Sequence, residues 1–255
     1  MLGRMLKELA AGARMLLRGF GFWRRDAGVM LLGLVPAAIV FAALVWGLVA
    51  LGIGLPGLVD WATPFADGWQ EFWRSAFRAL VTVVVFAGAA VLAFVTFTAL
   101  TLIVGDPFYE RIWKAVEADL GGEVPAEGPS FWSGVGNSLV LVVQGVLSAA
   151  VVAVAGFVPV VGGVLAAVLG AVLTGRLLAR ELAARAFDAR HLDPRVRRAL
   201  IRAHRWRFLG FGVATQLCFL VPLGAIATMP AAVAGATMLA RSVLDEVHPV
   251  AADRA

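Results

Sequence analysis

The sequence predicts an all-α integral membrane protein with two long transmembrane helices, helical hairpins that are partly re-entrant, and amphipathic interfacial helices. Hydrophobic residues make up 61% of the 255 residues and charged residues 15%, whereas soluble domains have roughly 45–50% and about 25%. Mean hydropathy is +0.88, and residues 27–56 carry no charge. About 20 apolar residues cross a bilayer core. The composition therefore argues against a soluble globular enzyme.

Residues 1–26 form the first predicted element, an amphipathic N-terminal helix. Its leucines recur at helical spacing, and basic residues such as Arg4, Lys7 and Arg14 fall on the other side. This pattern is typical of an interfacial helix on an anionic leaflet. The alternative is a helix packed against its own protein.

Two transmembrane helices are predicted next, at residues 27–56 and 80–105. Pro36 predicts a kink in the first, and the intervening segment 57–78 is expected to be a loop. Trp69, Trp73 and Phe77, which precede the second span, suit an aromatic belt at a membrane interface.

A new amphipathic helix is expected over residues 106–122, because Asp106 is a good N-cap and Pro107 a good first helical residue. The spacing places one set of residues on an apolar face: Phe108, Tyr109, Ile112, Trp113, Val116 and Leu120. It places a second set on the opposite, polar face: Glu110, Arg111, Lys114 and Glu117.

The uncharged segment 130–175 is too long for one span and predicts a helical hairpin with its turn at residues 157–163, around Pro159. We expect its second arm to continue past Arg176 to Arg185. Residues 176–207 are a basic, cytoplasmic segment in which Asp193-Pro194 again predicts a helix start.

The last apolar segment, 208–240, is too short for two full crossings. We expect a broken hairpin with its turn between Pro222 and Pro230, although one proline-kinked span also fits. A broken segment at membrane depth is a candidate pathway lining, and a simple proline kink is the plainer interpretation. The tail is 241–255. Basic residues concentrate in 1–26 and 176–207, which the positive-inside rule places in the cytoplasm, with 57–78 outside.

Four stretches resemble the sulfate permease CysZ and etoposide-induced-protein membrane family. They are Gly28 to Pro36, Asp106-Pro107-Phe108-Tyr109-Glu110, Pro159 to Gly163, and Phe211-Gly212 followed by Pro222 and by Met229 to Thr237. The resemblance implies a multi-pass protein of the bacterial inner membrane, homo-oligomers, contact with membrane lipids and, in some members, sulfate uptake. It also marks six pathway or hinge residues: Pro107, Phe108, Pro159, Pro222, Pro230 and Gly235.

The resemblance also implies an anion-binding turn before the first span. Family members hold sulfate near a Gly-Leu-Arg-Arg type turn; here Gly28-Val29 fits the first half, and Met30-Leu31 replaces the arginine pair. Arg24 and Arg25 lie just upstream. We expect Arg24, Arg25, Gly28 and Val29 to bind an oxyanion, because helix-start amides and guanidinium groups replace its water shell. The alternative is that both arginines are membrane anchors.

The remaining sequence patterns do not indicate a metal site, a cofactor or an enzyme activity. One cysteine, Cys218, and three scattered histidines offer no metal site and imply no cofactor. There is no Walker motif and no recognisable catalytic set, so no enzyme activity is expected. The arginines of 195–207 suit an anionic leaflet and not nucleic acid. The predicted function is a permease or channel for sulfate or a similar small oxyanion, supplying sulfur assimilation; the alternative is a membrane scaffold or homeostasis protein with no transported substrate.

Overall fold

The computed structural model describes residues 2–121, 131–157, 161–221 and 223–247, and side chains of 131–142 lie outside the description. Over these residues the chain is helical without strands, and four helices are long and apolar enough to cross a membrane: Ala27–Ala62, Glu71–Asp119, Gly162–Asp188 and Gly224–Glu246. The predicted all-α membrane fold is therefore confirmed.

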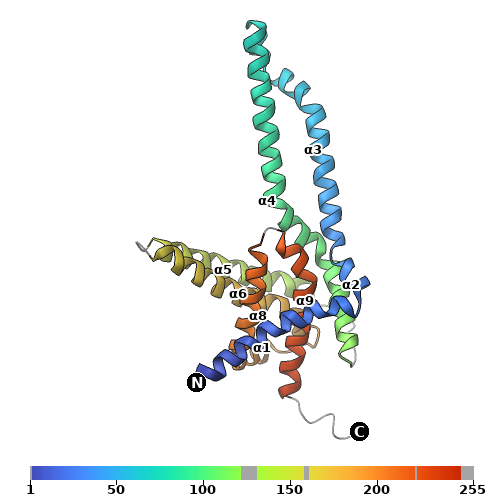
Figure 1. The fold of residues 1–255 in the computed structure, drawn as a ribbon, viewed down its shortest axis with the longest axis vertical. Helices are drawn as coiled ribbons and strands as arrows, with labels where there is room; N and C mark the ends of the chain where they lie inside the picture. The colour runs from blue at the N-terminus through green and yellow to red at the C-terminus, as the bar shows by residue number, and fades with distance from the viewer. Residues whose placement is uncertain (1, 122–130, 158–160, 222, 248–255) are drawn as a thin grey trace. The chain divides into compact units, whose positions relative to one another are not determined.

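The described helices follow one another along the chain as shown in Figure 1. In order they are α1 (Leu2–Gly21), η1 (Phe22–Arg24), α2 (Ala27–Leu32), α3 (Val35–Ala62), η2 (Pro64–Ala66), α4 (Glu71–Asp119), α5 (Phe131–Gly156), α6 (Gly162–Asp188), α7 (Pro194–Ala203), α8 (Arg205–Phe219) and α9 (Gly224–Val247). The chain divides into two compact units, Leu34–Pro107 and, together, Met1–Gly33 with Phe108–Ala255.

The unit Leu34–Pro107 consists of α3, η2 and the first part of α4, and it exposes many large apolar side chains, including Trp46 and Ile53. Such exposure suits lipid contact. The turn between the two helices is held by Arg78, whose guanidinium pairs with Asp60 at 3.3 Å and Asp67 at 2.8 Å. The predicted loop 57–78 is mostly helical, because α3 continues to Ala62 and α4 begins at Glu71.

Prolines end fewer helices than the sequence predicted. The prediction that Asp106 caps a new helix is wrong: α4 runs unbroken for 49 residues with Pro107 inside it. α3 likewise continues through Pro56. A proline removes one backbone hydrogen bond, but ending a helix in an apolar environment leaves several backbone groups unpaired at greater cost. At Pro36 the break lies just before it, between α2 and α3, and Pro36 occupies the first turn of α3, where its missing N–H costs nothing.

In the other unit, α1 packs against α8 and α9, and α6 packs against α8. Glycines make these crossings unusually close. A Cβ added at Gly12 would lie 1.9 Å from the carbonyl oxygen of Arg207, and one at Gly19 would lie 2.0 Å from that of Ala231. Gly212 faces the backbone of Gly175 in the same way. Small residues that let helix backbones touch are typical of membrane helix packing.

α1 therefore packs against its own protein, the second of the two interpretations. Gly12, Leu16 and Gly19 are buried on one face. Leu6, Leu17 and Phe20 remain exposed on another, by 54%, 66% and 37%. Because an apolar stripe stays uncovered next to basic residues, α1 also keeps the character of an interfacial helix.

Arg207 joins α1, α8 and α9 through carboxylates. Its Nε donates to Glu8 at 2.9 Å, and its Nη1 pairs with Glu246. This hydrogen bond from Arg207 lowers the pKa of Glu8 below its ordinary value of 4.5. A charged residue of the α1 polar face, Glu8, thus helps to hold α1 against α8.

The C-terminal hairpin differs from prediction in the place of its turn. α8 ends at Phe219 and α9 begins at Gly224, so the expected helix–turn–helix hairpin is present, but the turn ends at Leu223 and does not extend toward Pro230, which lies inside α9; Pro222 lies outside the described residues. The turn uses Leu223 at a φ of 61°. α9 is largely buried and forms the centre of this unit.

The arms α5 and α6 flank residues 157–161, where the hairpin turn was expected, and α6 continues to Asp188, past Arg185. They lie side by side, and Pro159 lies outside the described residues. Asp193 caps α7 as predicted, its Oδ1 accepting the Arg195 N–H at 2.6 Å.

Candidate oxyanion site

The predicted anion-binding turn lies between α1 and α2. Phe22 and Met30, both buried, anchor its two ends. Gly33, at the end of α2, abuts the side chains of Pro230 and Ile112; a Cβ added there would lie 2.6 Å and 2.8 Å from them. The structure thus places the predicted hinge residue Pro230 beside the end of α2, the helix whose start holds Gly28 and Val29.

The start of α2 already has an anionic partner. Asp26 is the N-cap, and its Oδ1 accepts the backbone N–H of Val29 at 3.0 Å. Gly28 is exposed, and a Cβ there would meet nothing closer than Asp26 Oδ1 at 3.5 Å. An oxyanion at this helix start would have to displace or share the Asp26 carboxylate.

The two predicted arginines differ in their surroundings. Arg25 forms an ion pair with Asp119 at the end of α4, and its side chain is 64% exposed. Arg24 is exposed, and no hydrogen bond or ion pair involves it within the described part of the chain. Arg24 is therefore an available cation, and Arg25 is tethered in a fixed position.

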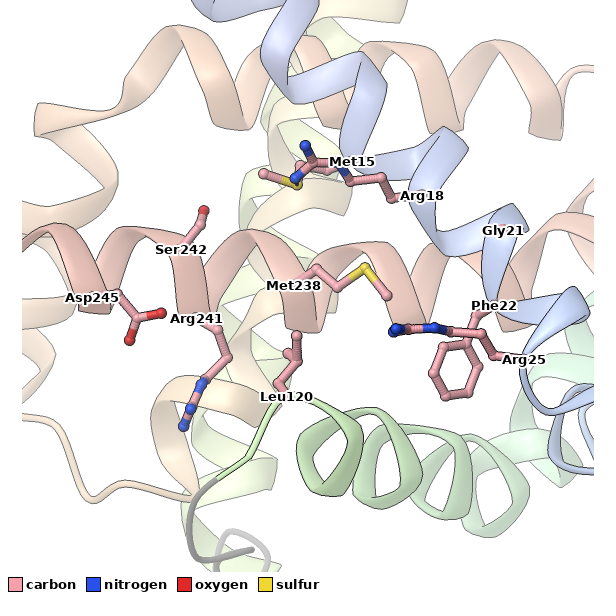
Figure 2. Close-up of a pocket in the computed structure, with 10 residues that line it drawn as sticks. All are labelled: Met15, Arg18, Gly21, Phe22, Arg25, Leu120, Met238, Arg241, Ser242 and Asp245. Atoms are coloured by element: carbon pink, nitrogen blue, oxygen red, sulfur yellow. The ribbon is translucent and has the colours of Figure 1, made fainter. Parts of the chain in front are cut away.

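Arg25 lines a pocket of about 500 Å³ between α1, α9 and the end of α4, which is shown in Figure 2. Its volume is that of a small-molecule site. Its ten lining residues include three arginines and one carboxylate. They are Met15, Arg18, Gly21, Phe22, Arg25, Leu120, Met238, Arg241, Ser242 and Asp245.

The arginines of this pocket are incompletely neutralised. Among the described residues, the one hydrogen bond of the Arg18 side chain goes to the sulfur of Met15, at 3.9 Å. Arg241 donates from Nη2 to the Gly121 carbonyl at 2.8 Å, and its buried Nε has no hydrogen-bond partner within the part of the chain that the structure describes. A guanidinium with an unpaired donor in a pocket favours an anionic ligand. Sequence reasoning missed Arg18 and Arg241, because nothing in the sequence brings α9 next to α1.

Arg241 also lies near a buried carboxylate, that of Glu117. Glu117 is 1% exposed; Arg190 binds both of its oxygens, at 3.0 Å and 2.6 Å, and Arg241 approaches to 3.7 Å. The prediction that Glu117 lies on the polar face, opposite the apolar residues, is wrong, because its carboxylate is buried. On a helical wheel it borders the buried face of Tyr109, Trp113 and Val116, and the arginine excess of 176–207 supplies its partner.

Three further predicted pathway residues lie in two helices, α4 and α9. Pro107 is exposed within α4, and Phe108 next to it is partly buried. Gly235 is buried in α9, where a Cβ would lie 2.6 Å from the carbonyl oxygen of Met15 in α1. Gly235 therefore sets the distance between the two helices that form the sides of the pocket.

These features define a polytopic helical membrane protein with an arginine-lined pocket beside a capped helix start. Residues 15–230 match the model of the family described as "Sulfate transporter CysZ/Etoposide-induced protein 2.4". Because the match spans most of the chain, the protein belongs to this family. The family is a transporter and membrane family and not a class of enzymes.

Proposed function

We propose that the protein is a permease or channel of the bacterial inner membrane for sulfate or a similar small oxyanion, and that it supplies sulfur assimilation. Membership of a family that includes sulfate transporters carries the proposal. The pocket with Arg18, Arg25 and Arg241 supports it, since it offers charged donors to a dianion. We extend the proposal to a homo-oligomer in the bilayer, as the family resemblance implies.

In this proposal the arginines replace part of the water shell of the oxyanion. Arg24, Arg25 and the amides near Gly28 and Val29 attract the ion at the membrane edge. Arg18 and Arg241 then receive it from either side of the pocket. Flow is passive, because the long uncharged runs offer no relay of ionisable groups.

Uptake of labelled sulfate into liposomes that contain the purified protein tests this function. Arg18→Gln is the sharpest variant, because its loss breaks no ion pair among the described residues. We expect sulfate flux to fall about tenfold, equivalent to about 1.4 kcal/mol of lost interaction. Arg195→Gln removes the same charge from the exposed start of α7 and serves as the control.

A second variant, Arg24→Glu/Arg25→Glu, tests the predicted anion turn. Unchanged flux in this variant, correctly inserted, would remove the turn from the pathway and leave the pocket. No flux from the unaltered protein, where a control permease is active, would favour the scaffold function. One observation favours that alternative: Arg25 and the Val29 amide are already engaged by Asp119 and Asp26.

A further inference from the structure

The unit Leu34–Pro107 holds a pocket of its own, of about 370 Å³, where α3 and α4 approach their connecting turn (Figure 1). α4 contributes one helix face to it, since Glu71, Arg74, Arg78 and Thr82 follow one another at steps of three and four residues. α3 contributes Asp60 and two apolar neighbours within one turn of it. The volume of this α3–α4 pocket lies in the range of small-molecule sites.

Arg78 forms the fixed part of the α3–α4 pocket. Its Nε donates to the Thr63 hydroxyl at 3.1 Å, and its guanidinium pairs with both Asp60 and Asp67. Two carboxylates therefore neutralise this one arginine. Arg78 holds the turn together, and the binding capacity of the pocket rests on its neighbours.

Glu71 and Arg74 keep unused capacity on the same face of α4. Glu71 is exposed and makes no hydrogen bond or ion pair with any residue that the structure describes. Arg74 has one hydrogen bond within the described chain, a long one of 3.4 Å to the Asp67 carbonyl oxygen. The exposed Asp60 carboxylate pairs with Arg78 through Oδ1. The pocket therefore offers acceptors for a cation and donors for an anion side by side.

Apolar surface continues from the pocket along both helices. On α4, Val85 and Phe86 follow Thr82 by three and four residues, so they lie on the face that lines the pocket, and both are exposed. On α3, the exposed Ile53 lies one turn before the pocket residues. Phe86 packs against α3 at Gly52, where an added Cβ would lie 3.3 Å from its ring. The two surfaces thus form one apolar strip that leads away from the charged pocket.

Exposed aromatic side chains surround the same turn. Trp61 is 82% exposed at the end of α3, and Phe72 and Trp73 are exposed at the start of α4. Between them, Phe65 and Trp69 contact each other with ring centroids 6.2 Å apart. Tryptophan is enriched where a membrane meets water. The charged pocket therefore lies at the depth of lipid headgroups, and the apolar strip lies at the depth of acyl chains.

We propose that the α3–α4 pocket binds a phospholipid whose headgroup carries a primary ammonium, as phosphatidylethanolamine does. The ammonium donates to the carboxylates of Glu71 and Asp60, and the phosphate accepts from the Arg74 guanidinium. An acyl chain lies along the apolar strip of Ile53, Val85 and Phe86. The ligand thereby matches both signs of charge and the adjoining apolar surface.

Other ligands match less of the pocket. An anionic phospholipid leaves Glu71 without a partner and is repelled by its charge. A choline headgroup has no N–H to donate and is recognised by aromatic rings, whereas none of the nine described residues that line the pocket is aromatic. A free zwitterion of similar charge leaves the apolar strip uncovered.

Native mass spectrometry of the full-length protein in a nonionic detergent, titrated with palmitoyl-oleoyl phosphatidylethanolamine, tests the proposal. Glu71→Gln should weaken this binding about tenfold, because a neutral hydrogen bond replaces a charge-assisted one. It should leave the weaker binding of phosphatidylcholine unchanged. Arg74→Gln should weaken the binding of both lipids, since both carry the phosphate. The matched controls, Glu110→Gln and Arg111→Gln, remove the same charges from α4 outside the pocket and should bind as the unaltered protein does.

Comparison of ligands identifies the occupant. Phosphatidylcholine or phosphatidylglycerol with the same chains, bound as tightly as phosphatidylethanolamine, would overturn the proposal. So would phosphatidylethanolamine binding that Glu71→Gln leaves unchanged, or that Glu110→Gln weakens equally. If O-phosphoethanolamine alone binds as tightly as the lipid, the apolar strip contributes nothing and the pocket belongs to a small soluble zwitterion instead.

A folding control keeps the result interpretable. Without added lipid, Glu71→Gln should melt at the temperature of the unaltered protein, because Glu71 has no hydrogen bond or ion pair among the described residues. If Arg74→Gln does not fold, Glu71→Gln carries the test alone, and an unaltered affinity for phosphatidylethanolamine then refutes the site. Sulfate flux does not enter this test, so its result is independent of the proposed function.

Discussion

The contact of α1 with α9 at Gly19 sets the geometry of the arginine pocket, and Gly19→Ala should disturb both stability and that geometry. The added Cβ would lie 2.0 Å from the Ala231 carbonyl oxygen and 2.8 Å from the Gly235 nitrogen. An ordinary contact begins at 3.4 Å, so the two helices must separate by about 1.4 Å at this point. Both obstacles are backbone atoms, which no side-chain rotation relieves.

The change in the free energy of unfolding caused by Gly19→Ala is the balance of opposing effects. Overpacking costs about 1–3 kcal/mol, and a gap of this size forfeits a large part of the dispersion energy at the crossing. The better helix propensity of alanine returns about 1 kcal/mol. We expect a net loss of about 2 kcal/mol, equivalent to a decrease of about 4–8 °C in Tm.

Thermal unfolding of the detergent-solubilised protein, followed by intrinsic fluorescence, measures this loss. Gly3→Ala is the matched control in the same helix, because an added Cβ there meets nothing within 4 Å; its Tm should not fall. If Gly19→Ala and Gly3→Ala melt alike, the close contact of α1 with α9 is wrong. Sulfate flux through Gly19→Ala should also fall, since Arg18 moves with α1.

The remaining predictions concern charges and a helix cap. Glu117→Gln should lower the free energy of unfolding by about 3 kcal/mol, because it leaves the half-buried guanidinium of Arg190 partly unpaired; Glu110→Gln, which weakens only an exposed helix pair, should cost under about 0.5 kcal/mol in the same denaturation assay. Because Arg207 lowers the pKa of Glu8, the unfolded state binds the proton more readily, so stability should fall as pH drops below about 4.5. Glu8→Gln should flatten that part of the pH–Tm curve, and an unchanged curve would exclude Glu8 as its source. Asp193→Ala should cost about 1 kcal/mol, visible as a lower Tm.

The sequence predicted the elements that depend on local patterns. Uncharged runs located the apolar helices, and Asp193-Pro194 located the start of α7. The same reasoning failed at Asp106-Pro107, since the dipeptide has the same local chemistry there. What differs is the setting: α7 begins in a polar, arginine-rich segment where water can satisfy helix ends, whereas Pro107 follows an apolar run.

The candidate site was less accessible to sequence reasoning. Arg24 and Arg25 could be selected because they precede an apolar run, but the residues that contact them in the fold could not be predicted. Asp119 lies 94 positions from Arg25, and Arg241 is farther still. Such contacts depend on how α1, α4 and α9 cross. The sequence did contain a sign of these crossings, the glycines Gly12, Gly19 and Gly235. A glycine, however, permits close packing without specifying which helix it packs against.

The glycine crossings of α1 also have a consequence for the order of events during synthesis. α1 leaves the ribosome before α8 and α9, yet its contacts at Gly12 and Gly19 are with backbone atoms of Arg207 and Ala231 in those later helices. At about 5–20 residues per second, roughly 10–40 s pass before α9 exists. During that interval the newly made α1 has no helix to dock on. We expect its uncovered leucines and its arginines to hold it on the leaflet, so that the bilayer serves as a temporary partner until α8 and α9 are made.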